Sequence, residues 1–367
     1  MENQLSQITI RGYKSIRELN SFKMKNLNIL IGANGAGKSN FIQMFSFLHN
    51  ILALNLQNHV IKNGGSETFL YHGGKITDSI FLQFEFGQNS YECTLEPTSD
   101  QSLFFSNEKI CYHDYNYPNP YCTTIGSGHR ESALKTDSSK SQYKRMSDYV
   151  INAIKSWKLY HFHDTGFTAK VKGLADINDN GFLRPDASNL ASYLYYLKNN
   201  HKSHYDNITD LIRQVAPFFD DFNLRPVPGN ENQIRLEWSE KGSDSYYNAH
   251  SFSDGTLRFI CLAALLMQPE DKFPSVILLD EPELGLHPYA ISVLADMIRF
   301  AALKTQVIIS TQSVTLVNHF EPDDLIIVNR EDGQSVFRRP SPEMMEEWLE
   351  NYALGDLWEK NLIGGRP

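Results

Sequence analysis

The stretch Asn26-Leu-Asn-Ile-Leu-Ile-Gly-Ala-Asn-Gly-Ala-Gly-Lys-Ser39 carries the clearest pattern in the chain. Its apolar part, Leu27 to Ile31, predicts a short buried strand. Gly32 to Ser39 then match G-x-x-x-x-G-K-[ST] and lead into a helical segment, which is the context of a phosphate-binding loop. The glycines of such a loop let backbone N–H groups face an anion, and the helix adds its positive N-terminal end.

The loop predicts a site for ATP and Mg²⁺. Lys38 is expected to reach the β- and γ-phosphates, and the Ser39 hydroxyl is expected to bind the metal ion. The alternative interpretation of the same pattern is a glycine turn before a helix, without a ligand. The other residues of this stretch that we expect to bind the cofactor are Asn34, Gly35, Ala36, Gly37 and Asn40.

The composition is that of a globular protein without a membrane segment. The chain has 367 residues, of which 41% are hydrophobic and 21% charged, and its longest apolar run, 259–267, is too short to span a bilayer. The N-terminal residues show neither a basic start nor an apolar signal core, so we expect a cytoplasmic protein. The net charge of −9 means that nucleic acid, if bound, must meet a local basic patch.

The four cysteines, Cys93, Cys111, Cys122 and Cys261, are far apart and include no C-x-x-C pair. This spacing favours reduced thiols over a disulfide framework or a zinc site. We therefore expect all four to be free.

Shifts in composition divide the chain into five expected segments. Alternating residues near 5–17 and 79–95 predict antiparallel strands in the first of them. No long heptad run interrupts the chain, so we expect no long coiled coil. The segments are an N-terminal lobe with the phosphate loop (1–113), a polar, loop-rich insertion (114–148), a helical insertion (149–220), a C-terminal lobe (221–340) and a C-terminal tail (341–367) with a helix at 343–349.

Strands and helices alternate in the last third of the chain. That order predicts β-α units in a mostly parallel core sheet, and therefore an α/β fold. The expected strands are 276–279, 306–309 and 325–328, and the expected helices are 255–267, 289–303 and 314–319.

Two acidic residues, Asp280 and Glu281, follow the apolar strand that ends at Leu279. At the end of a strand beside a phosphate loop, Asp280 would hold Mg²⁺ through water and Glu281 would polarise the attacking water. An acid pair after a strand is also a common solvated turn. The catalytic interpretation gains weight because Pro282-Glu-Leu-Gly-Leu-His-Pro288 comes next.

Four motifs together resemble the ABC-type ATPases of the RecF and SMC group. The closest resemblance is to the compact RecF-like ATPases of bacterial phage defence, relatives of the ATPase part of overcoming-lysogenisation-defect proteins. It implies a P-loop ABC-type ATPase head with an antiparallel β-subdomain, a mostly parallel core sheet and a helical insertion. The motifs are Gly32-Ala-Asn-Gly-Ala-Gly-Lys-Ser39, Ser253-Asp-Gly-Thr-Leu-Arg258, Leu279-Asp-Glu-Pro-Glu-Leu-Gly-Leu-His-Pro288 and Ser310-Thr-Gln-Ser313.

The resemblance implies a nucleotide site that is shared by two chains. Ser253, Asp254 and Gly255 match the signature loop, which binds the γ-phosphate held by the opposite subunit. Residues 283–287 match the loop that runs along the dimer interface. Out of context, Ser253-Asp-Gly also fits an ordinary helix cap. The catalytic residues expected on this basis are Lys38, Glu281, Gln312 and Ser253.

Three further residues are carried over from the family pattern. Lys14 and Ser15 resemble the Phe-Lys-Ser element that precedes the loop in SMC proteins, so they are expected near the nucleotide. Gln83 is the candidate for the glutamine of the first lobe that contacts Mg²⁺. The switch position, usually His, is Gln312, which cannot gain a proton near neutral pH, so we expect slow hydrolysis.

Two other clusters have competing interpretations. His161 and His163 share a strand face and could bind a metal, but no third ligand follows from the spacing, so a structural strand end is favoured. Aromatic and basic residues of the helical insertion could contact nucleic acid, although packing is the commoner role. The latter are Tyr195, Tyr196, Lys198, His201 and Lys202.

The leading functional hypothesis is an ATP-dependent dimeric switch that controls a separate effector, such as a nuclease or toxin, in phage defence. The long segment between Ser39 and Ser253 lacks paired heptads, which favours a compact RecF-like head over an SMC protein with long arms. The first alternative is a DNA repair or recombination ATPase that clamps DNA. The ATPase subunit of a membrane transporter fits the motifs less well.

Overall fold

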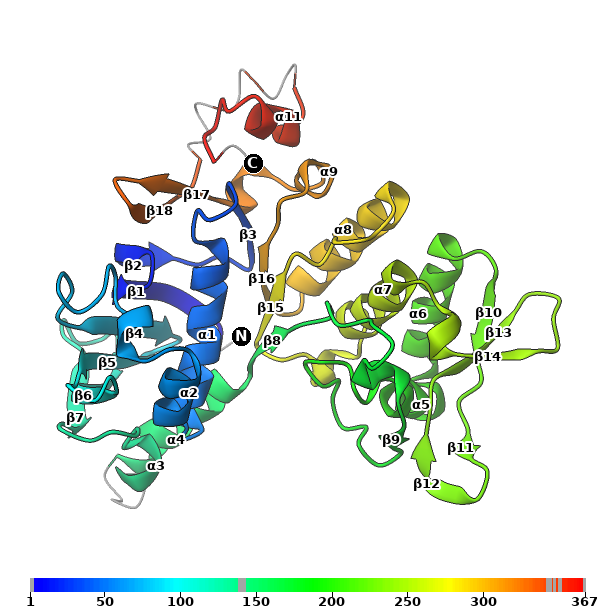
Figure 1. Cartoon of the computed structure of the whole chain (residues 1–367), viewed down its shortest axis with the longest axis horizontal. Helices are drawn as coiled ribbons and strands as arrows, with labels where there is room; N and C mark the ends of the chain where they lie inside the picture. Colours follow the sequence, from blue (N-terminus) through cyan, green and yellow to red (C-terminus); the bar gives the residue numbers. More distant parts are fainter. Residues whose placement is uncertain (1–2, 138–142, 341–344, 346–347, 349–351, 366–367) are drawn as a thin grey trace.

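The central feature of the computed structural model is a six-stranded sheet with the order β18-β17-β3-β16-β15-β8 (Figure 1). Neighbouring strands run parallel except for the terminal pair, β17 and β18. The strands are β3 (Leu27–Ile31), β8 (Trp157–Tyr160), β15 (Val276–Asp280), β16 (Gln306–Ser310), β17 (Leu325–Glu331) and β18 (Gln334–Arg338). The structure describes residues 3–137, 143–340, 345, 348 and 352–365. The predicted α/β fold with a mostly parallel core is confirmed.

A second six-stranded sheet is antiparallel and has the order β2-β1-β4-β5-β6-β7. Its inner face is apolar and its outer face is partly exposed, which explains the alternating pattern of β4. The strands are β1 (Leu5–Tyr13), β2 (Ile16–Lys23), β4 (Ile80–Phe86), β5 (Asn89–Pro97), β6 (Leu103–Tyr112) and β7 (Tyr121–Gly126). This sheet is the expected antiparallel β-subdomain.

Helix α1 (Lys38–Leu52) lies between the two sheets and carries the end of the phosphate loop. Its Phe45 ring lies 6.4 Å from the ring of Phe84 in the antiparallel sheet and 6.1 Å from that of Trp157 in the central sheet, measured between ring centroids. Side chains such as Leu278 of β15 belong to the same buried cluster. Helix α1 is therefore packed against both sheets.

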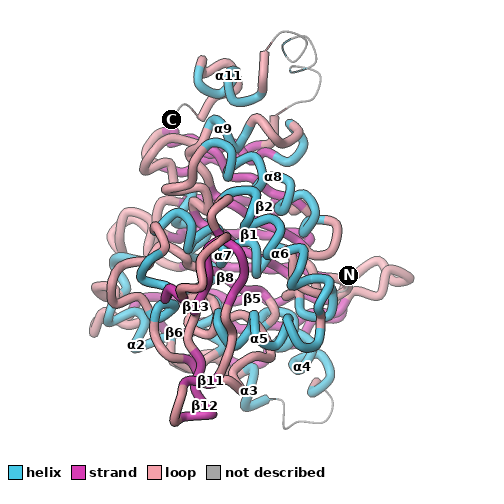
Figure 2. The backbone as a smooth tube through the Cα atoms, turned by 90° about the vertical axis from the view of Figure 1, so that its right-hand side faces the viewer, coloured by secondary structure: helices cyan, strands magenta, loops and turns pink. Residues whose placement is uncertain are grey.

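The other face of the central sheet is covered by α7 (Asp254–Leu266) and α8 (Pro288–Ala302). Beyond them lies a second lobe, which faces the viewer in Figure 2. It contains helices α5 (Leu190–Asn200) and α6 (Lys202–Val215) and the short strands β9 (Ala175–Asp176), β10 (Phe219–Phe222), β11 (Pro226–Val227), β12 (Asn230–Ile234), β13 (Glu237–Glu240) and β14 (Tyr246–Asn248). The expected helical insertion corresponds to α5 and α6.

The remaining helices pack against α1, α8 and one another. Single 3₁₀ turns occur at Ser66–Thr68, Lys170–Lys172, Ala249–Ser251, Glu270–Lys272 and Pro322–Asp324. Within the described residues the longest helices, α1 and α8, have 15 residues each, so no long coiled coil is present there. No described helix is long and apolar enough to cross a membrane. These remaining helices are α2 (Leu56–Lys62), α3 (Leu134–Asp137), α4 (Lys144–Lys155), α9 (Val314–Val317) and α11 (Leu354–Glu359).

The segment after residue 114 differs from the expected loop-rich insertion. It contains β7, the edge strand of the antiparallel sheet, which places Cys122 directly opposite Cys111 of β6. The Cα atoms of these two cysteines are 4.1 Å apart and their sulfur atoms are bonded, so the expectation of four free thiols was wrong for this pair. Cys93 and Cys261 are free and buried. The sequence spacing did not reveal the pair because strand pairing, not proximity along the chain, brings the two residues together.

The C-terminal residues fold back onto the central sheet. The Gly355 N–H donates a hydrogen bond of 2.6 Å to Oδ1 of Asn318, just after α9, and the Gly365 N–H donates one of 2.7 Å to Oδ1 of Asn329 in β17. The expected tail thus contains α11 (Figure 1). The helix expected at 343–349 lies, apart from Met345 and Trp348, outside the described residues.

Candidate functional site

A small cavity of about 130 Å³ lies where β3 meets α1. Most of its lining comes from the phosphate-loop stretch, and one side chain, Gln312, comes from the turn after β16. Ala36 is buried and does not line this cavity. The lining residues are Ala33, Asn34, Gly35, Gly37, Lys38, Ser39, Asn40 and Gln312.

Lys38 folds over the loop and occupies its centre. Its ammonium donates hydrogen bonds to the carbonyl oxygens of Gly32 at 2.5 Å and Ala33 at 3.1 Å. Burial lowers the pKa of Lys38, while the nearby carboxylates of Glu281 and Asp280 oppose this shift. The amine therefore lies within electrostatic reach of the acid pair, as expected for a residue between phosphates and metal.

The acid pair lies at the carboxyl end of β15, beside β16. Asp280 is opposite Ser310, whose hydroxyl donates a hydrogen bond to Oδ1 of Asp280. Glu281 has a left-handed backbone with φ of 44°, and its N–H donates to the Ser310 carbonyl at 2.9 Å. The side-chain amide of Gln312 donates a hydrogen bond to Oε1 of Glu281. The structure thus joins the predicted base and the predicted switch residue.

Glu283 accepts hydrogen bonds from the turn after β16, which carries Gln312. The family motif included Glu283 but gave no role to its side chain. Its Oε1 accepts hydrogen bonds from the Thr311 hydroxyl at 2.5 Å and from the Gln312 N–H at 3.3 Å. Burial raises the pKa of Glu283, and the hydrogen bond from Thr311 opposes that shift. Glu283 therefore helps to hold the backbone of Gln312 in place.

The signature residues form the N-terminus of α7 and pack against the turn before α8. Ser253 caps the helix by accepting a hydrogen bond of 3.1 Å from the Thr256 N–H. Gly255 approaches that turn so closely that a Cβ there would lie 2.4 Å from the Gly285 carbonyl oxygen. Ser253 is exposed and does not line the phosphate-loop cavity.

Arg258 connects the signature helix to two other segments, which the sequence analysis did not recognise. Its guanidinium donates to the carbonyl oxygens of Phe162 at 3.0 Å, His163 at 3.3 Å and Leu284. The side chain is buried, and burial lowers its pKa. Arg258 therefore ties together α7, the end of β8 and the loop that follows Glu281.

Two predicted cofactor residues lie behind the loop and do not line its cavity. The Lys14 ammonium donates to Oε1 of Gln43 at 2.6 Å and lies over the rings of Tyr13 and Phe69. Ser15 is buried and accepts a hydrogen bond of 2.7 Å from Nδ2 of Asn40. These residues support the loop and α1 from the turn between β1 and β2.

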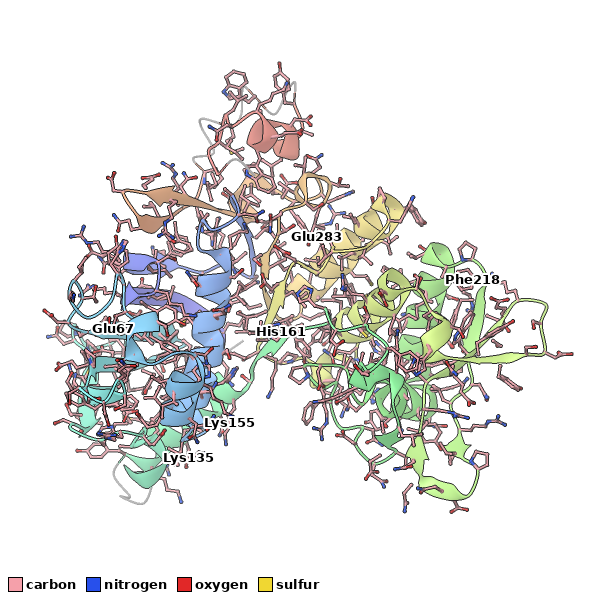
Figure 3. All side chains as sticks on the ribbon, viewed as in Figure 1. Glu67, Lys135, Lys155, His161, Phe218 and Glu283 are labelled. Atoms are coloured by element: carbon pink, nitrogen blue, oxygen red, sulfur yellow. A yellow bond between two sulfur atoms is a disulfide. The ribbon has the colours of Figure 1, made fainter. Side chains whose placement is uncertain are left out.

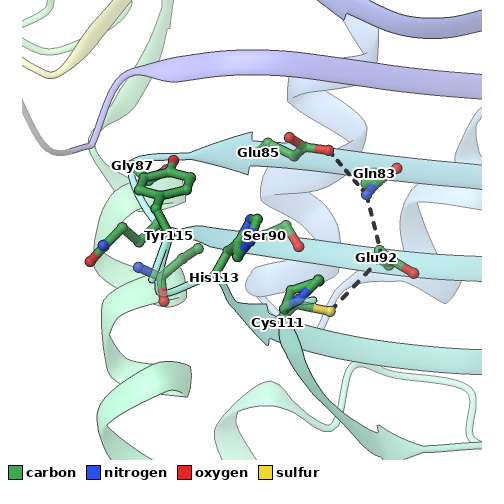
Figure 4. A pocket seen from close by; sticks show the side chains of 11 residues that line it. Gln83, Glu85, Gly87, Ser90, Glu92, Cys111, His113 and Tyr115 are labelled. Carbon is green, nitrogen blue, oxygen red and sulfur yellow. Dashed lines mark hydrogen bonds between the residues drawn. The ribbon is translucent and has the colours of Figure 1, made fainter. Parts of the chain in front are cut away.

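Gln83 is not brought to the phosphate loop. It lies in the middle of β4 on the outer face of the antiparallel sheet, where its amide donates to Glu85 at 3.2 Å and Glu92 at 3.3 Å (Figure 4). The neighbouring residues Leu82 and Phe84 point inward to the cluster that contains α1. Because side chains alternate along a strand, Gln83 points away from α1 and cannot bind a metal held by Ser39.

His161 lies at the end of β8 (Figure 3). Leu159 of β8 and Leu278 of β15 contribute to the cluster on the α1 side of the sheet. By alternation His161 and Asp280 point to that same side. Burial and the neighbouring His163 lower the pKa of His161, while Asp280 opposes this shift. The sequence pattern allowed His161 to bind a metal together with His163, but the structure places His161 near Asp280.

The aromatic and basic cluster of the helical insertion is largely used in packing. Lys198 pairs with Asp221 at 2.8 Å, and Lys202 pairs with Asp206. The Tyr196 hydroxyl lies 3.3 Å from Nε2 of His201. Tyr195 and Tyr196 are partly buried against the core cluster that contains α5 and α6, which favours the packing interpretation.

The residues at the cavity fit a magnesium nucleotide. Ser39 and Asp280 offer a hydroxyl and a carboxylate, the oxygen ligands that Mg²⁺ prefers together with phosphate oxygens and water. A dedicated all-protein cage is not required, and among the described residues no group of three or more His, Cys, Asp or Glu could form one. Mg²⁺ would supply charge neutralisation at the β- and γ-phosphates.

The fold and this arrangement define an ABC-type ATPase head of the SMC and RecF kind. A family model described as "AAA domain, putative AbiEii toxin, Type IV TA system" matches residues 27–318, and the chain belongs to that family. Family membership implies ATP binding and hydrolysis. No curated protein matches the chain.

Two solved structures show the same fold. One is the SMC head bound to the C-winged helix domain of ScpA, with a TM-score of 0.56, 14% identity and coverage of 95% of this chain and 99% of that chain. The other is the SMC head with an extended coiled coil from Pyrococcus furiosus, bound to the C-terminal domain of ScpA, with a TM-score of 0.53, 14% identity and coverage of 95% and 98%.

Proposed function

We propose that this protein is an ATP-dependent switch that dimerises around two shared nucleotides and thereby controls a separate effector, a nuclease or a toxin, in defence against phage. Lys38 would bind the phosphates, Ser39 and Asp280 would hold Mg²⁺, and Glu281 would polarise the attacking water. Gln312 would orient Glu281 through the hydrogen bond between their side chains. An uncharged switch residue supports slow turnover, which suits a switch that must persist in one state.

The observation that carries the proposal is the position of Ser253. It caps a helix whose N-terminus is open to solvent, and it does not line the cavity formed by the phosphate loop of its own chain. A helix N-terminus with a free face is suited to bind an anion that a second chain presents. The site is therefore complete only when two chains meet.

The surface around Ser253 supports such a contact. Phe167 is 82% exposed and its ring lies 4.8 Å from that of His250, three residues before Ser253. Leu284 is 51% exposed on the loop that Arg258 binds. In the proposed dimer, Phe167 and Leu284 are the apolar side chains that the second chain would cover.

A separate partner is supported by one of the solved structures, and a toxin–antitoxin setting is supported by the family description. The family description names a toxin and a toxin–antitoxin system. The SMC head of known structure was solved with a partner domain, the C-winged helix domain of ScpA. By analogy, the nucleotide-driven dimer of this chain would present or hide a surface for its own partner.

The association can be tested with the Glu281→Gln protein, in which bound ATP persists. Light scattering should report a dimer with ATP and Mg²⁺ and a monomer with ADP. A monomer under both conditions would contradict the shared site. The defence role is tested separately, with phage added to cells that express the chain together with its neighbouring genes. The wild-type chain should protect these cells, and Lys38→Ala should abolish the protection.

A further inference from the structure

The hairpin of β17 and β18 reaches the back of the phosphate loop through one residue, Ser335. Its backbone N–H donates a hydrogen bond of 2.7 Å to the Ser15 carbonyl. Its hydroxyl oxygen lies 2.7 Å from Oγ of Ser15 and 2.5 Å from the carbonyl oxygen of Ala36. Ser335 is fully buried, so each of these contacts is shielded from water.

These contacts form a directed chain of hydrogen bonds. A hydroxyl has one proton, so Ser335 cannot donate to both neighbours. All groups are satisfied when Asn40 Nδ2 donates to Ser15, Ser15 donates to Ser335, and Ser335 donates to the Ala36 carbonyl. The chain starts on the first turn of α1 and ends on the phosphate loop itself.

The bond to Ala36 fixes the orientation of one peptide of the loop. In a planar trans peptide the C=O and the next N–H point in opposite directions. Because Ser335 holds the Ala36 carbonyl at the back of the loop, the Gly37 N–H points toward the cavity that Gly37 lines. A flipped peptide would instead present a carbonyl oxygen to the anion and repel it.

The same contact explains why position 37 is glycine. Gly37 has φ of 115°, and a Cβ at this position would lie 2.1 Å from Oγ of Ser335 and 2.8 Å from Oγ of Ser15. Glycine is needed here because the two serines occupy the space behind the loop.

We propose that Ser335 is a positioning residue for nucleotide binding: it presets the Ala36–Gly37 peptide so that the loop meets phosphate in its binding conformation. The proposal rests on the proposed function, since it assumes that the loop binds a nucleotide. It adds the hairpin of β17 and β18, which lies outside every motif, to the elements that build the site.

Preorganisation predicts a loss of affinity without a loss of turnover. Ser335→Ala should weaken binding of both ADP and ATP by about 5- to 30-fold, the range for one buried hydrogen bond whose partner is left unpaired. The ratio of the two affinities should stay constant because the loop amides cradle phosphates that both nucleotides carry. At saturating ATP, turnover should stay within about twofold, because bound phosphates order the loop themselves.

The experiment is a fluorescence titration of the full chain with labelled ADP and ATP in Mg²⁺, combined with steady-state turnover and thermal melting. Ser335→Thr restores a hydroxyl and should recover most of the affinity. Ser15→Ala removes the next link, so the double variant with Ser335→Ala should be less impaired than two independent losses predict. Ser15→Ala also carries the test if Ser335→Ala fails to fold.

The matched control is Ser192→Ala. Ser192 is another fully buried serine, and its hydroxyl donates to the Asp176 carbonyl at 2.7 Å in the second lobe. The Ser192→Ala variant should lower the melting temperature, as Ser335→Ala should, but should leave the nucleotide affinity unchanged. If both variants bind nucleotide like the wild type, Ser335 is only a stabilising residue and the inference is wrong. A wild-type protein that binds no nucleotide would overturn both the inference and the proposed function.

Discussion

The side-chain amide of Gln312 donates a hydrogen bond to Oε1 of Glu281, across the gap between the ends of β16 and β15. The backbone of Gln312 is held in turn by Glu283, which accepts from its N–H. The proposed switch residue is therefore an uncharged donor that is hydrogen-bonded to the proposed base. An amide in this position orients the carboxylate and cannot itself take up a proton from the attacking water.

Replacing Glu281 with Gln should separate binding from turnover. The substitution keeps size and hydrogen bonding but removes the base, so turnover should fall by roughly 10²- to 10⁴-fold while ATP affinity changes little. Phosphate release and nucleotide titration measure the two quantities. Wild-type turnover in this variant would remove Glu281 from the mechanism.

Replacing Gln312 with His should introduce a pH dependence that the wild type lacks. An imidazolium beside Glu281 would lower the basicity of the carboxylate, so the rate of the variant relative to the wild type should rise as pH increases from about 5.5 to 7.5. Gln312→Ala serves as the control, because it removes the contact without adding a titrating group. If the ratio of the Gln312→His rate to the wild-type rate stays constant over this pH range, residue 312 does not act on Glu281.

Arg258 should matter for stability and for association. Arg258→Met leaves the carbonyl oxygens of Phe162, His163 and Leu284 without their donor, which should cost about 2–4 kcal/mol of unfolding free energy. Arg258→Lys should not restore it, because one ammonium cannot match the planar fork of a guanidinium.

The control for Arg258 is Arg299→Met. Arg299 donates to the His319 carbonyl and to Asp296 from an exposed position, so its loss should change stability by no more than about 0.5 kcal/mol. Denaturant unfolding gives the stability, and light scattering with ATP gives the association. Full association by a folded Arg258→Met protein would show that association does not depend on the contacts of Arg258.

The sequence predicted the parts of the site that lie on continuous motifs. The strand, loop and helix from Leu27 onward, the acid pair after β15 and the cap at Ser253 all follow from local pattern and capping chemistry. The phosphate loop and the acid pair lie close together in the structure because the parallel strands β3 and β15 bring their carboxyl ends to one edge of the sheet.

The sequence could not predict the contacts that depend on strand order. Gln83 was chosen by residue type, but the alternation of β4 turns it to the outer face of the antiparallel sheet. Ser335 lies 320 residues from Ser15, and the contact of β18 with β2 brings them together. The Cys111–Cys122 bond likewise depends on the register of two strands.

Binding to DNA, if it occurs, should be electrostatic and independent of sequence. The chain carries a net charge of −9, so only a local patch is available for phosphates. With four to six phosphate contacts, the logarithm of affinity should fall against the logarithm of salt concentration with a slope of about −4 to −5. Salt-independent binding, or a strong preference for one duplex sequence, would contradict this expectation.

The shared site makes its sharpest prediction when two defective chains are mixed. Lys38→Ala removes the phosphate-binding amine, and Ser253→Arg blocks the helix end that would meet the partner's nucleotide. Each homodimer then has two damaged sites. In a mixed dimer, one site has both defects, whereas the other pairs the intact Lys38 of one chain with the intact Ser253 of its partner.

Mixing should therefore restore turnover toward half of the wild-type value per mixed dimer, although neither variant is active alone. Ser253→Arg by itself should keep nucleotide binding, because Ser253 does not line the cavity of its own chain. Differently tagged chains allow mixed dimers to be purified before the assay. Proven mixed dimers that are no more active than either parent would count against a shared site, because a site complete within one chain gains nothing from its partner.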